Sequence, residues 1–193
     1  MAYRRTGGFT LLELLITLAV AAVITALAVP SFKAITARNR LAMSSNQLLG
    51  GMRAARMLAV TRNTAVSICA GNADEGCHAD WLQGEWIVFI DRPPLGVFDA
   101  DDELHLADSM DMPDGLFLAG NGPFNRAIVF RPSGLARWPS GAFAAGRLRV
   151  CVNESISPNA TELVLIGSGR AVSQACDLGG VCPALSASGA NCL

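Results

Sequence analysis

The sequence lacks a surplus of positive charge. Its 193 residues contain 15 Lys and Arg against 16 Asp and Glu, and the formal net charge is −1. Proteins that bind nucleic acid without sequence preference usually carry a strongly basic face, because phosphate contacts supply most of their affinity. The charge balance therefore excludes a strongly basic nucleic-acid binder. No internal repeat is present, and the apolar content is sufficient for the core of one ordinary domain.

Metal-binding and catalytic motifs are also missing. The chain has two histidines, His78 and His105, and neither has a second ligand at helical or turn spacing. Because no C-x-x-C pair is present either, no metal site is expected. The acidic cluster at 99–103 lacks the glycine and the distal glutamate of an EF-hand loop, so a solvated acidic turn is the simpler interpretation. Without a nucleophile elbow or a phosphate-binding glycine loop, we expect neither an enzyme, with catalytic residues, nor a cofactor.

What the sequence does contain is a short basic leader followed by a long apolar run. Arg4 and Arg5 precede the run, and residues 9–29 hold a single charge, that of Glu13. At about 1.5 Å per residue, a helix over this run covers roughly 30 Å, the thickness of the hydrocarbon core of a bilayer. The run is therefore predicted to anchor the protein in a membrane.

A secretory signal peptide is the alternative interpretation of this segment. Such a peptide ends in small residues after the apolar run, and residues 26–28 could supply that cleavage site. Two features argue against it. The polar break lies before the apolar run, and Glu13 costs about 2.5 to 3.5 kcal/mol in a membrane helix, so it is expected to have a function.

The motif G-F-T-L-L-E-L-L at residues 8–15 resembles the type III signal sequence of type IV pilins and of the pseudopilins of type II secretion. The resemblance implies that prepilin peptidase cuts between Gly8 and Phe9 and that Phe9 becomes N-methylated. It also implies that Glu13 pairs with the N-terminal ammonium of a neighbouring subunit during assembly. Each of these charges is costly alone in a low dielectric, so pairing is physically favourable. That Glu13 merely lies at the level of the lipid headgroups is the alternative.

Beyond Pro30 the helical pattern resumes. Apolar and small residues recur at spacings of three and four and form one continuous stripe: Leu41, Ser45, Leu48, Met52, Ala55 and Ala59. We therefore predict a single helix over about 9–61, with a membrane-embedded part at 9–30 and a periplasmic part at 31–62. The arginines interspersed along it are interpreted as solvated positions, with a binding face as the alternative: Arg38, Arg40, Arg53, Arg56 and Arg62.

From residue 64 the periodicity becomes that of strands. Strands are expected at 64–69, 85–91, 126–131, 147–152 and 161–167, between turns rich in Gly, Pro and Asp. No helix-length pattern lies among them, which argues against parallel βαβ units. The predicted fold class is α+β, a long N-terminal helix packed on an antiparallel β-sheet domain over 63–193, with a C-terminal loop at 177–193 held down by cysteines.

Residues 81–91 and 96–99 are similar to the signature of GspH/FimT-type minor pilins and pseudopilins, in which a W-x-x-G-W-x-V-F-x-D strand precedes a polar turn with a glycine. Here Glu85 is inserted before Trp86, and Pro93-Pro94 replaces the polar turn. Both faces of the strand at 86–90 are apolar, so we expect an interior strand.

Six cysteines behind a membrane-targeting segment indicate an oxidising compartment, which for this leader is the periplasm. Local closure favours Cys69 with Cys77, around a short loop. The pairs Cys151 with Cys176 and Cys182 with Cys192 are the next most economical, but six cysteines leave these two open.

The charges are unevenly distributed along the chain. Residues 74–114 hold twelve acidic residues and one arginine, whereas residues 116–193 hold six arginines and three acidic residues. The C-terminal half is therefore a candidate anion-binding surface. Some FimT-like minor pilins bind DNA through a C-terminal G-R-x-R motif, but residues 169–172 read Gly-Arg-Ala-Val, without the second arginine. Arg170, Arg147 and Arg149 are the candidate DNA contacts.

Taken with its motifs, the resemblance implies a minor pilin incorporated in or at the tip of a type IV pilus, supporting pilus assembly. A minor pseudopilin of type II secretion and a DNA-binding minor pilin for natural transformation are the alternatives. The implied partners are the inner membrane, prepilin peptidase, the major pilin and other minor pilins (or pseudopilins) and, weakly, DNA. The implied location is the bacterial inner membrane, crossed once with the C-terminal domain in the periplasm, and then the pilus or pseudopilus.

Overall fold

The computed structural model describes residues 9–183 and residue 185. They fall into two compact units that divide between Thr36 and Ala37. Helix α1 (Leu11–Arg62) begins in the first unit and ends in the second, which contains all the strands. The leader, including Gly8 of the expected cleavage site, and Cys192 lie outside the described residues.

Helix α1 begins at a side-chain cap. The backbone N–H of Glu13 donates to Thr10 Oγ1 at 3.2 Å, which satisfies one of the N–H groups that a helix leaves free at its start. The helix then continues through Pro30 to Arg62. The prediction of a single helix over about 9–61 is therefore confirmed to within two residues.

The second half of α1 supplies one wall of the core. All six members of the predicted stripe are buried, from Leu41 to Ala59. The hydroxyl of Ser45 donates to the Leu41 carbonyl oxygen at 2.6 Å, so this polar residue is satisfied within its own helix. The spacing of three and four thus correctly identified the face of the helix that packs on the domain.

Sheet A is antiparallel in every pairing, and its strands follow the order β4-β3-β1-β6-β7, with β2 paired to β1. The members are β1 (Val66–Asn72), β2 (Gly76–His78), β3 (Glu85–Ile90), β4 (Glu103–Ser109), β6 (Ala127–Phe130) and β7 (Ala136–Arg137). As predicted, β3 is an interior strand, and its five residues from Trp86 to Ile90 are all buried.

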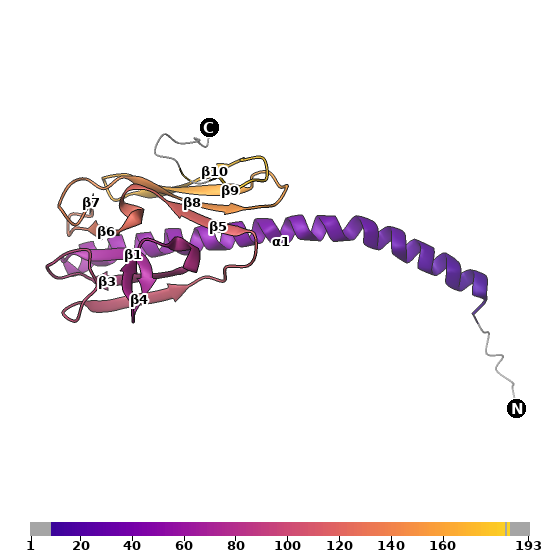
Figure 1. Cartoon of the computed structure of the whole chain (residues 1–193), viewed down its shortest axis with the longest axis horizontal. Helices are drawn as coiled ribbons and strands as arrows, with labels where there is room; N and C mark the ends of the chain where they lie inside the picture. The colour runs from indigo at the N-terminus through magenta and orange to yellow at the C-terminus, as the bar shows by residue number, and fades with distance from the viewer. Residues whose placement is uncertain (1–8, 184, 186–193) are drawn as a thin grey trace, which may run out of the picture. The chain divides into compact units, whose positions relative to one another are not determined.

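Sheet B is also antiparallel, with the strand order β10-β9-β8-β5. Its members are β5 (Leu116–Gly120), β8 (Gly146–Val152), β9 (Ala160–Leu165) and β10 (Ala171–Cys176). Figure 1 shows the two sheets one above the other, alongside the second half of α1. The α+β fold predicted from the sequence is present.

Two short 3₁₀ helices lie between strands of the two sheets. In η1 (Trp81–Gln83), the indole N–H of Trp81 donates to the carbonyl oxygen of Phe124 in η2 (Gly122–Asn125) at 2.7 Å. The two aromatic rings also pack edge to face. Trp81, the first residue of the sequence signature, thus anchors η1 to η2.

Candidate assembly helix, basic groove and clamped tail

The N-terminal part of α1 presents an exposed acidic group on an exposed apolar surface. Glu13 lies in the first helical turn, where the helix dipole favours a carboxylate. Within residues 9–183 and 185, its side chain makes no hydrogen bond or ion pair. Phe9, the expected new N-terminus, is also exposed. The Glu13 carboxylate is therefore available to a group outside the chain.

The apolar side chains that follow Glu13 have no partners in the described chain. Leu14, Leu18 and Ile24 are each more than half exposed, and none of the most apolar stretch is buried. By length and composition, this part of α1 is able to cross a membrane. A surface of this kind needs lipid or neighbouring helices to cover it.

Of the three arginines that the sequence predicts as DNA contacts, the structure excludes Arg149. Its side chain is 2% exposed, and its Nη2 lies 2.5 Å from Oε1 of Glu162, which is equally buried. Nε of Arg149 donates to the same oxygen at 3.0 Å. The expectation that Arg149 contacts DNA is therefore corrected, because its guanidinium is directed into an ion pair and away from solvent. The half-buried Arg147 lies 3.7 Å from the same carboxylate, whereas Arg170 is exposed.

Arg170 lines a groove that also contains arginines of α1. The groove has a volume of about 520 Å³, and its lining combines three cations with apolar side chains: Arg53, Arg56, Met57, Val60, Thr61, Gly169, Arg170, Ala171 and Val172. Arg56 is held in place, because its Nε donates to the Gly134 carbonyl oxygen at 3.0 Å. Sequence reasoning treated Arg53 and Arg56 as solvated positions. Their spacing of three residues, which puts them on one helix face, was the available signal.

Gly169 has a structural role beside this groove. Its φ is +77°, and a Cβ at this position would lie 1.9 Å from the Gly134 carbonyl oxygen, the same oxygen that accepts from Arg56. The turn before β10 therefore requires glycine, and this turn places Arg170 at the mouth of the groove. The glycine of the Gly-Arg pair noted in the sequence is explained by this packing.

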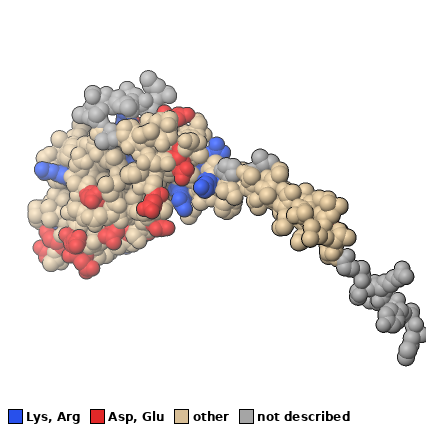
Figure 2. Space-filling model, turned by 45° about the vertical axis from the view of Figure 1, so that its right-hand side comes forward, with Lys and Arg blue, Asp and Glu red and all other residues tan. Residues whose placement is uncertain are grey.

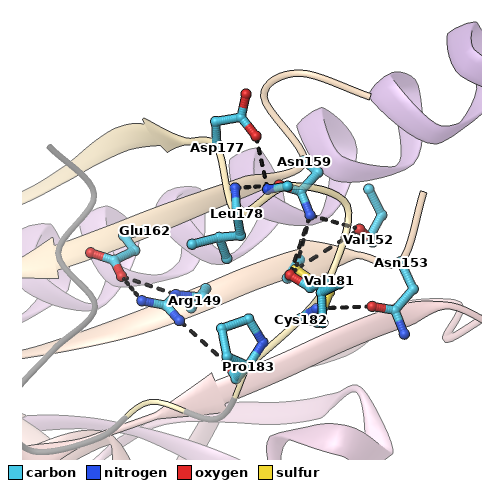
Figure 3. Close-up of a disulfide and its surroundings, with 12 residues drawn as sticks. Arg149, Val152, Asn153, Asn159, Glu162, Asp177, Leu178, Val181, Cys182 and Pro183 are labelled. Carbon is cyan, nitrogen blue, oxygen red and sulfur yellow. Dashed lines mark hydrogen bonds and ion pairs between the residues drawn. A yellow bond between two sulfur atoms is a disulfide. The ribbon is translucent and has the colours of Figure 1, made fainter. Parts of the chain in front are cut away.

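The C-terminal tail is clamped onto sheet B by a disulfide between Cys151 and Cys182 (Figure 3). The expected pairing of Cys151 with Cys176 is wrong. Both residues lie opposite Ala160, on the two sides of β9, so β9 separates them. Two strand spacings amount to about 9.6 Å, well beyond the Cα separation that a disulfide allows. Cys176 is also in a disulfide.

Hydrogen bonds hold the same tail in register. The side chain of Asn159 donates to the Val152 carbonyl oxygen at 3.2 Å and accepts from the Leu178 N–H at 2.7 Å. The N–H of Cys182 donates to Asn153 Oδ1 at 2.9 Å. Figure 3 shows Asn159 between β8 and the tail, where it bridges the two. The predicted pair Cys69–Cys77 is present and closes the β1–β2 hairpin.

The acidic side chains of Asp99 and Asp102 stabilise a surface loop. Asp102 accepts hydrogen bonds from the N–H groups of Arg92 and Asp99, and Asp99 accepts from Asp101, so these carboxylates cap backbone groups of their own loop. Figure 2 shows Asp and Glu side chains gathered on the globular part of the chain. No group of three or more His, Cys, Asp or Glu able to hold a metal occurs in the described part of the chain.

Comparison with known proteins places this geometry in a family. A family model described as type II transport protein GspH matches residues 44–180, and a prokaryotic N-terminal methylation motif matches residues 3–29. None of the curated proteins compared with the chain matches it significantly.

Two crystal structures of the type IV minor pilin FimU from Pseudomonas aeruginosa share the fold. In space group P21 the identity is 18%, with a TM-score of 0.52, covering 72% of this chain and 92% of FimU. In space group P65 the identity is 17%, with a TM-score of 0.50, covering 69% and 92%. At this identity the likeness establishes the architecture alone.

Proposed function

Because the chain belongs to the GspH/FimT family of pilin-like proteins, we propose that it is a minor pilin that is incorporated in or at the tip of a type IV pilus and supports pilus assembly. The observation that carries the proposal is the Glu13 carboxylate, exposed and unpaired among described residues at the start of an exposed apolar helix. The methylation motif and this helix indicate a membrane-anchored pilin.

The proposed mechanism follows from the cost of isolated charges in lipid. Cleavage between Gly8 and Phe9 creates an N-terminal ammonium, four residues before Glu13. A neighbouring helix shifted along the fibre axis can bring its own Glu13 carboxylate next to that terminus. Each subunit then neutralises one charge of the next. Lateral packing is therefore more favourable than leaving the ammonium and the carboxylate isolated in lipid.

The type II secretion pseudopilin is the second candidate, because the matching family model carries a type II transport description. The likeness to FimU, a type IV minor pilin, supports the pilus. A deletion strain separates the two candidates. Loss of surface pili with normal protein secretion supports our proposal, whereas a secretion defect with normal pili overturns it in favour of the pseudopilin.

Mass spectrometry of the membrane-extracted protein tests the processing step. We expect a chain that begins at Phe9 and carries one methyl group. A mature terminus after Ala28 would instead identify an ordinary signal peptide and would remove the assembly mechanism.

The Glu13→Ala variant tests the assembly step. We expect normal processing and membrane insertion, but reduced recovery of the subunit in sheared pili. Thr17→Ala is the matched control: its hydroxyl donates to the Leu14 carbonyl oxygen of its own helix, so the change removes a polar group from the same segment without removing a charge. Incorporation of Glu13→Ala at the level of the control would show that the carboxylate has no role in assembly.

A further inference from the structure

The groove that contains Arg170 holds cations that have no acidic partner. Arg53, Arg56 and Arg170 line it, and no Asp or Glu does. Within the described part of the chain, none of the three makes an ion pair. Three guanidinium groups held together repel one another, so a ligand that supplies negative charge is favoured here.

The groove is lined in part by the first two residues of an edge strand, Ala171 and Val172 of β10, and the edge continues beyond the groove. Strand β10 is the last strand of sheet B, and four of its six residues are exposed. The N–H of Ile166 donates to the Arg170 carbonyl oxygen, which fixes the alternation of the antiparallel ladder. The backbone groups of Ala171, Ser173 and Ala175 consequently point away from β9, and they have no partner in the described residues.

The floor of the groove is apolar. Met57 and Val60 of α1 and Val172 of β10 are exposed there, and no aromatic ring lines the groove. An extended polypeptide satisfies all three features at once, because its backbone completes β10, its apolar side chains cover the floor and its carboxylates meet the arginines. A nucleic-acid strand would pair its phosphates with the arginines, but it would leave the strand edge unpaired and have no ring on which to stack.

We propose that this groove binds an extended acidic segment of a neighbouring subunit, which adds as a strand to the free edge of β10. The chain itself carries a segment of this chemistry. Residues 99–109 include Asp99, Asp101, Asp102, Glu103 and Asp108, and they contain β4, the exposed edge strand of sheet A. An acidic edge on one subunit and a basic edge groove on the next form a head-to-tail contact, the type of contact that builds open fibres.

That the bound segment belongs to a neighbouring subunit rests on the proposed function. That the segment is acidic and extended rests on the groove alone. The test therefore uses a probe that requires no assembly. The full chain, purified in detergent micelles, is titrated into a fluorescent peptide of residues 99–109 at physiological salt, and binding is measured by anisotropy. A peptide with Asn and Gln in place of Asp and Glu is the control for charge. A peptide N-methylated at alternate backbone nitrogens is the control for strand addition.

We expect the acidic peptide to bind and both control peptides to bind at least about fivefold more weakly. Arg53→Ala and Arg170→Ala should each weaken binding by about two- to fivefold, as expected for exposed ion pairs. Arg62→Ala is the matched control, because Arg62 is exposed on the same helix outside the groove and should leave binding unchanged.

Ser173→Pro tests the strand edge directly, because it removes an N–H that points away from β9 and leaves the β9–β10 ladder its own hydrogen bonds. We expect loss of peptide binding with an unchanged melting temperature. If that variant unfolds, the N-methylated peptide tests the same hydrogen bonds without a change in the protein.

Equal binding of the acidic and amide peptides would overturn the inference. So would tighter binding of a DNA oligonucleotide that depends on Arg53 and Arg170 and displaces the peptide, because the groove would then be a nucleic-acid site. Either result leaves the pilin proposal intact. Conversely, normal incorporation of Glu13→Ala removes the assembly mechanism and leaves the peptide result standing.

Discussion

Gly51 of α1 lies directly against the indole ring of Trp86 in β3, so closely that a Cβ on Gly51 would stand 2.4 Å from Cη2. Trp86 is 1% exposed and lies in an interior strand, so the ring has no space into which to withdraw. At this point the helix lies so close to the sheet that only a residue without a side chain fits. The close approach of α1 to sheet A at this point therefore requires glycine at position 51.

Gly51→Ala is expected to destabilise the domain by about 1 to 3 kcal/mol, the usual cost of adding a methyl group to a filled core. The free energy of unfolding is measured by denaturant titration with tryptophan fluorescence as the probe. Gly50→Ala is the control: in the described part of the chain, no atom beyond the adjoining helix backbone and chain neighbours lies within 4 Å of a Cβ there, and the residue is exposed in the same helix. This variant should be stabilised by about 0.5 to 1 kcal/mol. Equal effects of the two changes would contradict the close contact.

The elements predicted from the sequence are those whose burial is one-sided or complete. The stripe of α1 has helical spacing, and strands β1, β3, β6, β8 and β9 are largely buried, so their residues are apolar. The strands that pair with a single neighbouring strand were missed: β2, β4, β5, β7 and β10. Of these, β4 and β10 alternate little and expose most of their side chains. An exposed edge strand has a turn-like composition, and only the pairing shows that it is a strand.

The site residues also divide into those with a local sequence signal and those that depend on strand pairing. Glu13 could be proposed as an assembly residue from the sequence because an acidic residue in an apolar run is locally conspicuous. The burial of Arg149 could not be predicted, because its partner Glu162 is selected by the register of β8 against β9. Disulfide choice followed the same logic, since short loop closure identified Cys69–Cys77 but sheet order decided the partner of Cys151.

Peptide mapping without reduction checks the disulfides. We expect one linked peptide that joins Cys69 to Cys77 and another that joins Cys151 to Cys182. A peptide linking Cys151 to Cys176 would contradict the sheet order, because β9 lies between them. Cys182→Ser should leave the Cys69–Cys77 link intact and increase proteolysis near residue 180, since the tail would lose its covalent attachment.

The buried Asp91 predicts a dependence of stability on pH. Desolvation by burial raises the pKa of Asp91 to about 6, although its Oδ2 accepts hydrogen bonds from the Ser67 hydroxyl and the Gly96 N–H. Its Oδ1 is buried and has no hydrogen-bond partner among the residues that the structure describes. Because the pKa is higher in the folded chain, the folded state binds more protons than the unfolded state at pH values between about 4 and 6. The stability that the protein has with Asp91 protonated is therefore fully present below about pH 4 and is lost as the pH rises through about 6.

Asp91→Asn removes the charged form. We expect this variant to be more stable than the parent at pH 8, by up to about 3 kcal/mol, with a difference that shrinks toward pH 4. Asp177→Asn is the control with the opposite sign. The Ser157 hydroxyl lowers the pKa of Asp177, so its contribution is present at neutral pH and is lost as the pH falls. A stability difference for Asp91→Asn that is constant between pH 4 and pH 8 would show that burial does not penalise this carboxylate.

The ion pair between Arg149 and Glu162 predicts an asymmetric response to truncation. Glu162→Leu leaves the guanidinium of Arg149 buried without its carboxylate, at a cost of about 3 to 5 kcal/mol. Arg149→Met should cost less, because the Glu162 carboxylate keeps Arg147, whose Nη1 already lies 3.7 Å away and whose side chain is partly exposed. The Arg149→Met/Glu162→Leu double variant should recover most of the loss, since both buried charges are removed and Arg147, which also loses the Glu162 carboxylate, is partly exposed to water. Denaturant titration of the four proteins completes the cycle, and strictly additive losses would show that the two residues are not coupled.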